Sequence, residues 1–182
     1  MTGDIVPIVE YTFTSTDRLL LDANIWLFMY GRQDPKDSRI PIYSRAFANI
    51  LNAKSRIFLD VLVLSEFINR YSRIEHNIVK DSHGPKEFKR FRKSPEFKTV
   101  AEDIVTASRQ ILKHCKRTGS GFESVDINAI LTDYKERCPD FNDQMLVEIC
   151  KTKGLKLVTH DGDFKHCGLI LLTANKNILL KN

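Results

Sequence analysis

Apolar residues occur along this chain in short runs, and stretches with helical periodicity separate them. The run at 19–21 leads into apolar positions with helical spacing up to Tyr30. A second periodic stretch predicts a helix over 40–53, and the run at 56–63 predicts another strand. Strands that alternate with helices in this way are typical of an α/β protein with a parallel sheet.

The next segments continue the pattern up to an interruption. Residues 65–76 read as a helix capped by Ser65 or a near neighbour. Residues 77–98 break the periodicity and contain seven basic and three acidic residues, so we expect an insertion there. Helical periodicity resumes from Pro95 to about Lys116.

The C-terminal third returns to alternation. Residues 127–138 predict a short helix, and Asp140 opens a second helix that stops at Gly154. Runs at 155–160 and 168–173 predict the last two strands. We therefore expect a three-layer α/β/α sandwich with a central, mostly parallel sheet and right-handed crossovers. The expected organisation is one domain over 1–182, with a helical and basic insertion at about 77–125.

Carboxylates follow the apolar runs or begin the helical stretches at several separated positions. They are Asp22, Glu66, Asp143 and Asp161, with Asp140 and Asp163 beside them. Residues that follow parallel strands meet at one edge of the sheet, where ligands bind. Like charges gathered there repel and raise one another's pKa values, so a cation is needed among them. Oxygen ligands of this kind favour hard divalent ions such as Mg²⁺ or Mn²⁺.

The excess of basic over acidic residues indicates the kind of substrate that the protein binds. The chain has 28 Lys and Arg against 23 Asp and Glu, for a net charge of +5. Without the six carboxylates 17 acidic residues remain, and the rest of the chain carries +11. A basic body around an acidic pocket suits a polyanionic substrate, although solvated Lys and Arg would give the same composition.

The cysteines, the histidines and the lengths of the apolar runs indicate the cellular environment of the protein. Four cysteines without a Cys-x-x-Cys spacing are expected to be reduced and structural, and the scattered histidines do not suit zinc. No run approaches the length of a membrane-spanning segment, and the N-terminus does not resemble a signal peptide. We therefore expect a soluble, cytoplasmic protein that does not bind a membrane.

Four of these segments, in this order, resemble the acidic motifs of the PIN domain, a metal-dependent nuclease fold that includes VapC-type toxins. The segments are LLLDANIWL, LSEFINR, DFNDQMLVEIC and LVTHDGDF. The resemblance covers roughly 18–75 and 126–175, and the middle of the chain has no counterpart in a minimal PIN domain.

The resemblance implies a Mg²⁺- or Mn²⁺-dependent endoribonuclease. Asp22, Glu66, Asp143 and Asp161 are then the catalytic and metal-binding quartet. Asp163 matches a further acidic position and is expected to assist or replace Asp161 at the metal. Asn24 matches a polar position that orients the first carboxylate or a bound water, and it is also a candidate substrate contact.

Each acidic residue also has an ordinary structural explanation. Asp22 suits a helix cap, and Glu66 complements a helix dipole. Asp161 and Asp163 flank a glycine and suit a turn. Asp140 fits an N-cap well enough that we leave it outside the quartet.

Basic residues of the insertion are the candidate substrate contacts. They are Lys89, Arg90, Arg92 and Lys93, interleaved with Phe88 and Phe91. Such a mixture holds phosphates and stacks unpaired bases. The same residues also suit a solvated loop or a surface that binds an antitoxin.

Three function classes are compatible with these residues. The first is a ribonuclease that cleaves RNA, as the toxin of a toxin–antitoxin pair with a small antitoxin partner and a homodimeric state implied by the resemblance. The second is a catalytically silent PIN-like module that binds RNA or protein. The third is a metal-dependent phosphatase or a flap nuclease, but LDANIW lacks the second Asp of the aspartyl-phosphatase motif.

Overall fold

A single parallel sheet forms the centre of the protein. The computed structural model describes residues 3–32, 34–82, 84–136 and 140–179. Six strands are hydrogen-bonded in the order β1-β6-β5-β2-β3-β4, and every pair is parallel. The strands are β1 (Ile5–Pro7), β2 (Arg18–Leu21), β3 (Arg56–Leu59), β4 (Cys115–Arg117), β5 (Lys156–Val158) and β6 (Leu171–Thr173). The predicted α/β class is confirmed.

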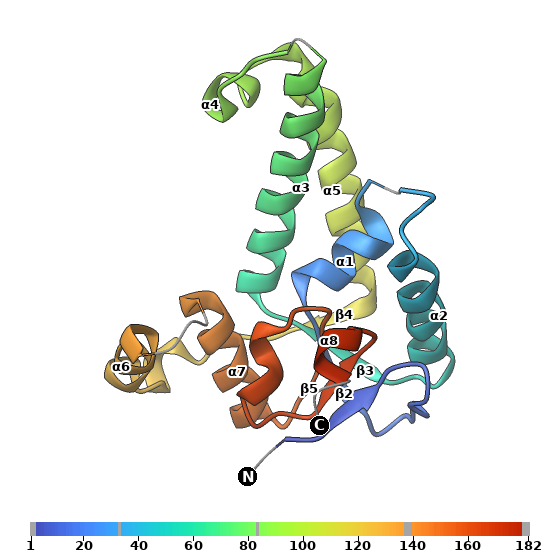
Figure 1. Cartoon of the computed structure of the whole chain (residues 1–182), viewed down its shortest axis with the longest axis vertical. Helices are drawn as coiled ribbons and strands as arrows, with labels where there is room; N and C mark the ends of the chain where they lie inside the picture. Colours follow the sequence, from blue (N-terminus) through green and yellow to red (C-terminus); the bar gives the residue numbers. More distant parts are fainter. Residues whose placement is uncertain (1–2, 33, 83, 137–139, 180–182) are drawn as a thin grey trace.

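Helices connect the strands and cover the sheet (Figure 1). They are α1 (Ala23–Tyr30), α2 (Arg39–Asn52), α3 (Val61–Asp81), α4 (Phe88–Phe91), α5 (Pro95–His114), α6 (Ile127–Glu136), α7 (Phe141–Lys153) and α8 (Lys176–Leu179), with 3₁₀ turns η1 (Phe122–Ser124) and η2 (Asp163–His166). The connections from β2 through β3 to β4 run in one direction across the sheet, and the connection through α7 returns the chain to β5. Because crossovers between parallel strands are right-handed as a rule, this reversal places α2 and α3 on one face of the sheet and α7 on the other.

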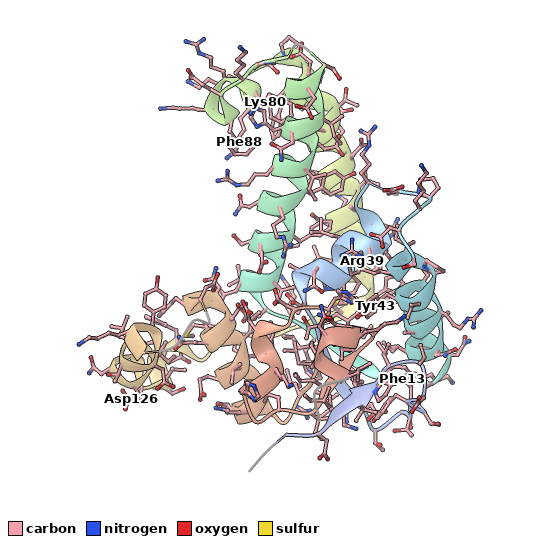
Figure 2. The ribbon with its side chains drawn as sticks, in the orientation of Figure 1. Phe13, Arg39, Tyr43, Lys80, Phe88 and Asp126 are labelled. Carbon is pink, nitrogen blue, oxygen red and sulfur yellow. The ribbon has the colours of Figure 1, made fainter. Side chains whose placement is uncertain are left out.

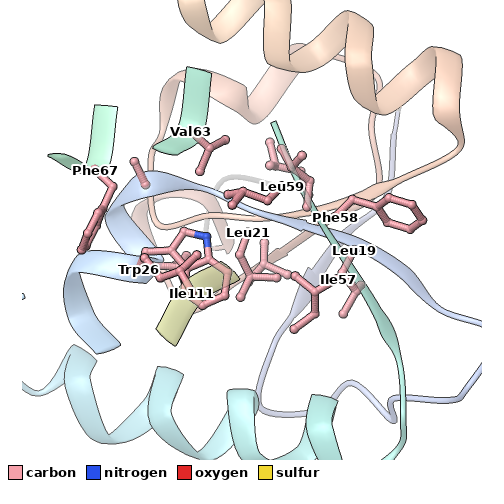
Figure 3. Close-up of a cluster of buried hydrophobic side chains, with 14 of the residues drawn as sticks. Leu19, Leu21, Trp26, Ile57, Phe58, Leu59, Val63, Phe67 and Ile111 are labelled. Carbon is pink, nitrogen blue, oxygen red and sulfur yellow. The ribbon is translucent and has the colours of Figure 1, made fainter. Parts of the chain in front are cut away.

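The core is built on the two central strands. β2 and β3 are buried from their second residue onward, as expected for parallel strands covered on both faces. Trp26, Phe67 and Ile111 pack around them from α1, α3 and α5 (Figure 3). Trp26 is fully buried, so this aromatic residue is part of the core, as its position in an apolar stretch predicts.

The boundary between β3 and α3 differs from the prediction. The apolar run 56–63 is not one strand, because β3 ends at Leu59 and α3 begins at Val61. The side chain of Asp60 accepts a 2.9 Å hydrogen bond from the backbone N–H of Leu62 and so caps the helix. The prediction of Ser65 as the cap was therefore wrong, and Glu66 lies in the second turn.

A hairpin of two long helices occupies the middle of the chain. α3 continues to Asp81, well past the point where its periodicity was expected to end. α5 packs beside α3, and α4 lies at the far end of the hairpin (Figure 1). The segment predicted as an insertion is thus largely helical in the residues that the structure describes.

Two short edge strands were not predicted. β1 pairs with β6, and β4 pairs with β3, each over three residues. The helix predicted over 127–138 is present as α6, and 137–138 lie outside the described residues. Among the described helices, none is both long and apolar enough to cross a membrane.

The cysteines agree with the prediction as far as they are described. Cys115, Cys150 and Cys167 are free thiols. Burial raises the pKa of Cys115 and of Cys150 to about 12, so both are protonated and unreactive at neutral pH. Cys138 lies outside the described residues.

Candidate functional site

Asp22 lies at the carboxyl end of the central strand β2 and is almost completely buried. It caps α1, because its Oδ1 accepts a 2.6 Å hydrogen bond from the backbone N–H of Ala23. Its Oδ2 accepts a 2.6 Å hydrogen bond from the side-chain amide of Asn24. The predicted cap and the predicted orientation by Asn24 are therefore both present.

Thr159 connects Asp22 to the end of the neighbouring strand β5. Its hydroxyl donates a 2.7 Å hydrogen bond to Oδ2 of Asp22. The same oxygen of Thr159 accepts from the backbone N–H of Asp161 at 2.9 Å and from Asn24 Nδ2 at 3.2 Å. One fully buried hydroxyl thus organises two predicted acidic residues.

Thr159 was not predicted as a site residue. The available signal was a hydroxyl residue that directly follows the apolar run 155–158 and precedes an acidic turn. Thr is common in strands, so this position alone does not indicate a role at a site.

Burial and neighbouring charge act together on Asp22. Burial raises its pKa to about 6, and the negative charges of Glu66 and Asp161 add to the rise. The hydrogen bonds from Thr159 and Ala23 oppose it by stabilising the carboxylate form. Glu66 and Asp161 therefore lie close enough to Asp22 to repel it.

Asp143 lies in the first turn of α7. Its backbone N–H donates a 3.0 Å hydrogen bond to Oδ1 of Asp140, which is the N-cap. Burial raises the pKa of Asp143 to about 8, and the adjacent charge of Asp140 adds to the rise. The charges of Asp22, Asp161 and Glu66 raise it further. The fold thus brings the four predicted acids within electrostatic range of one another.

Glu66 belongs to this group but has a basic neighbour. Its Oε1 lies 3.0 Å from Nη1 of Arg70, one turn further along α3. The pair is partly exposed, with 27% of the Glu66 side chain accessible to solvent. Such pairs contribute little stability, so Arg70 does not prevent Glu66 from turning to another cation.

Asp161 and Asp163 have different positions. Asp161 Oδ1 accepts a 3.1 Å hydrogen bond from the backbone N–H of Asp163, so the predicted turn is present. Asp161 raises the pKa of both Asp22 and Asp143. Asp163 is exposed at the start of η2, where it lines a cavity of about 560 Å³ together with Asp143.

A second cavity, of about 390 Å³, opens on the other side of this turn. Gly162 lines both cavities. The second one is also lined by Asn24 and Asp161, and by the basic residues Arg32 and Arg70. Two of the predicted acids therefore line one cavity and Asp161 lines the other, whose walls carry three arginines and three aspartates.

His160 is held between the acidic turn and α2. The Tyr43 hydroxyl lies 2.9 Å from His160 Nδ1 and accepts a hydrogen bond from the Ala174 backbone N–H at 3.0 Å. Asn175 Nδ2 donates a 2.7 Å hydrogen bond to the His160 carbonyl oxygen. Burial, with the charge of Arg39, lowers the pKa of His160, and a neutral imidazole can accept from Tyr43. These supports join segments far apart in the sequence and were not predicted.

The carboxylates of this site are the oxygen ligands that the expected metal prefers. Within the described ranges, no three acidic, histidine or cysteine residues form a ready-made metal cage. The chemistry nevertheless fits a hard divalent cation, because the group is made of carboxylates whose mutual repulsion a cation would relieve. Mg²⁺ keeps several water ligands and does not require an all-protein cage.

The predicted basic contacts lie away from these acids. Lys89 and Arg90 are in α4, Arg92 and Lys93 follow it directly, and all four are exposed. Phe91 is fully buried. The expectation that Phe91 stacks on bases was therefore wrong, since its ring belongs to the core of the hairpin end.

The chain is similar in sequence to a known family and in fold to a solved structure. The sequence model of the PIN domain matches residues 19–169. A chain in the crystal structure of VapBC2 from Rickettsia felis bound to a DNA fragment from their promoter superimposes with a TM-score of 0.55. The two chains are 16% identical, and the match covers 86% of this chain and 98% of that chain. Comparison with curated proteins finds no match.

Proposed function

The chain belongs to the PIN domain family, and on this premise we propose that it is a Mg²⁺- or Mn²⁺-dependent endoribonuclease that hydrolyses RNA phosphodiester bonds. One observation carries the proposal. Burial raises the pKa of Asp143, and three carboxylates from other segments raise it further, namely Asp22, Glu66 and Asp161. The most buried of these, Asp22, is held by two side-chain donors. A bound cation would relieve this repulsion with all four carboxylates ionised, whereas the metal-free site has to hold a proton.

The proposed ligands follow from burial and position. Asp22 and Asp143 would hold the metal directly, and Glu66 and Asp161 would hold it through water or hold a second ion. Asp163, on the cavity beside Asp143, assists from the rim. When bound, the metal lowers the pKa of a water molecule and stabilises charge on the phosphate oxygens.

The chain's own residues supply the rest. Asn24 and Thr159 fix both the position and the ionised form of Asp22. Asp143 holds a proton near neutral pH and releases it when the cation binds, so metal affinity rises with pH. Arg32 and Arg70 line the adjacent cavity and are paired with Glu75 and Glu66. Binding of Glu66 to a cation would release Arg70 to contact the RNA backbone.

The biological setting belongs to the same proposal. We propose one PIN-like domain over 1–182 with an insertion at about 77–125, because the buried side chains of α3 and α5 are continuous with the main core. We also propose a cytoplasmic toxin that is a homodimer and is neutralised by a small antitoxin. The similarity in fold to a VapBC2 chain supports this setting.

A catalytically silent PIN-like module that binds RNA or protein is the second candidate. One observation favours it, which is that no three of the described acidic residues are assembled to hold an ion. The two candidates differ in whether divalent ions bind and support cleavage.

Incubation of the purified chain with labelled single-stranded RNA, duplex RNA and DNA tests the proposal. We expect RNA cleavage with Mg²⁺ or Mn²⁺, none with EDTA, and loss in Asp22→Asn and Asp143→Asn. Glu102→Gln, which changes an exposed acid in the middle of α5, is the matched control. Cleavage that persists in EDTA, or an equal loss in Glu102→Gln, would overturn the metal mechanism.

The toxin role has a separate test. Induced expression in bacteria should arrest growth, and expression of Asp143→Asn should not. The proposal expects a small antitoxin gene beside this one, and co-expression of its product should restore growth and yield a complex that co-purifies with the chain. Unimpaired growth at full expression of an active nuclease contradicts the toxin role and leaves the nuclease proposal intact.

A further inference from the structure

One exposed face of α3 runs from the acidic site to the end of the helical hairpin. Five exposed residues recur on it at intervals of three or four, and these are Ser65, Asn69, Arg73, Asn77 and Lys80. Residues at these intervals lie above one another on a helix. We call this face the α3 track. Its side chains are hydrogen-bonding or positively charged, and it begins beside Glu66.

The far end of the track meets a dense group of positive charges. Residues 86–93, which include α4, contain five basic residues and one acidic residue, and we call them the basic tip. The one acid, Glu87, is paired with Arg90 at 3.3 Å. Lys86, Lys89 and Lys93 are all exposed.

Aromatic packing fixes the tip on the hairpin. The ring of the buried Phe91 lies 5.1 Å from His76 and 5.3 Å from Phe97. The Arg73 guanidinium lies over the Phe88 ring at 4.8 Å, which joins the track to the tip. The basic side chains thus extend from a packed base, and less entropy is lost when they bind a ligand.

The length of the α3 track determines how many nucleotides an RNA strand needs to span it. Glu66 and Lys80 are fourteen residues apart in one helix, which corresponds to about 21 Å at 1.5 Å per residue. At about 3.4 Å per stacked nucleotide this distance equals about six nucleotides. Lys80 and Phe88 lie at the hairpin end in Figure 2, and α4 projects to the same side of α3 as α7, whose first turn carries Asp143.

We propose that the α3 track and the basic tip bind the backbone of one RNA strand. The tip packs on His76, ten residues or about 15 Å beyond Glu66 along α3, so about four to six nucleotides on one side of the cut are needed to reach from the carboxylates to the tip. This proposal rests on the proposed function, because it assigns the cut to that site. Lys, Arg, Asn and Ser donors bind phosphates and sugars without regard to sequence.

A protein partner fits this surface less well. Protein interfaces depend on buried aromatic or apolar anchors. At the tip the Phe91 ring is already buried, and the Phe88 ring is covered by Arg73. Apart from Glu87, which is paired with Arg90, the exposed groups that remain at the tip are long cationic side chains, which suit a phosphate backbone.

Binding without cleavage is the first test. The full chain in EDTA is titrated with labelled RNA strands of 20 and 4 nucleotides, using the wild type and Lys86→Gln/Lys89→Gln/Lys93→Gln. We expect the variant to bind the 20-mer at least ten-fold more weakly. Loss of three phosphate contacts at about 0.7 each should lower the salt-dependence slope by about 2. The control Lys54→Gln/Lys113→Gln/Lys116→Gln changes three exposed lysines outside α3 and α4.

Cleavage with Mg²⁺ is the second readout. The tip variant should lose at least five-fold more kcat/KM on the 20-mer than on the 4-mer, which is too short to reach the tip. Equal losses on both lengths, an equal effect of the control, or unchanged 20-mer binding with loss of an acidic protein partner would each overturn the proposal. Tip-dependent RNA binding without any cleavage would leave the track standing and contradict the nuclease function.

Discussion

The hydroxyl of Thr159 donates a 2.7 Å hydrogen bond to Oδ2 of Asp22, which joins residues 137 positions apart in the chain. The same hydroxyl oxygen accepts the backbone N–H of Asp161. A single buried group therefore positions carboxylates from two neighbouring strands. It also favours the ionised form of Asp22, because the hydrogen bond lowers the pKa that burial raises.

Thr159→Val tests this relationship. Valine preserves the shape of the side chain and removes the donor, so the pKa of Asp22 should rise further and Asp161 should lose an anchor. We expect Mn²⁺ affinity to fall by about ten-fold or more, as is usual for groups that orient ligands. Isothermal titration calorimetry measures the affinity, and thermal unfolding is expected to show a loss of about 1–3 kcal/mol.

Thr173→Val is the matched control for this substitution. Thr173 is also fully buried and lies at the end of the adjacent strand β6. Its hydroxyl oxygen accepts a hydrogen bond from the backbone N–H of Asn175. It should cost similar stability with a much smaller change in metal affinity. Equal metal affinity in Thr159→Val and Thr173→Val would contradict a special role for Thr159.

Asp143→Asn should stabilise the metal-free protein. The substitution removes a charge that Asp140, Asp22 and other acids repel. At pH 9 in EDTA we expect Tm to rise by about 2–4 °C, which corresponds to about 1 kcal/mol in a chain of this size. Mg²⁺ should raise Tm in the wild type and not in the variant. An equal rise in Tm for Glu102→Gln would show that the loss of any acidic side chain has this effect.

Metal-free stability should depend on pH through the same groups. The pKa values of Asp22 and Asp143 are raised to about 6 and about 8, above the unfolded value of about 3.9. The folded protein therefore binds more protons than the unfolded chain, and the free energy of unfolding falls as pH rises through these values. Tm in EDTA should decrease between pH 5.5 and pH 9.

Two conditions check the source of this pH dependence. Saturating Mg²⁺ should flatten the curve, because the bound ion stabilises the ionised carboxylates. Asp143→Asn should remove most of the decrease between about pH 6 and pH 8, where Asp22 is already ionised and Asp143 is not. A Tm that rises with pH in EDTA would mean that these carboxylates are not repelled in the folded state.

Much of the fold could be predicted from the sequence because buried parallel strands are continuous apolar runs. The runs at residues 19–21 and 56–59 both became central strands. The edge strands β1 and β4 were missed because three residues leave almost no periodicity to detect. The start of α3 was misplaced because apolar residues 61–64 fit either element, and the cap at Asp60 decides between them.

The acidic residues of the site were predictable, and their supports were not. Asp22 and Asp161 each follow a strand, so topology alone directs them to one edge of the sheet. Thr159, Tyr43 and Asn175 act through hydrogen bonds between segments distant in the sequence. Their residue types are common in any protein, so only the folded structure shows which of them contact the site.

Phe91→Ala tests whether packing fixes the basic tip. The ring is fully buried against His76 and Phe97, and removing such a ring costs about 3–5 kcal/mol. Because the ring lies at the end of a hairpin, we expect amide hydrogen exchange in residues 86–98 to become faster. The exchange rates in β2 should change much less. Phe122→Ala, at a side chain that is 55% exposed, should change stability by less than about 0.5 kcal/mol. Unchanged exchange at the tip would show that other contacts hold α4, and the fixed arrangement of its lysines would then need another cause.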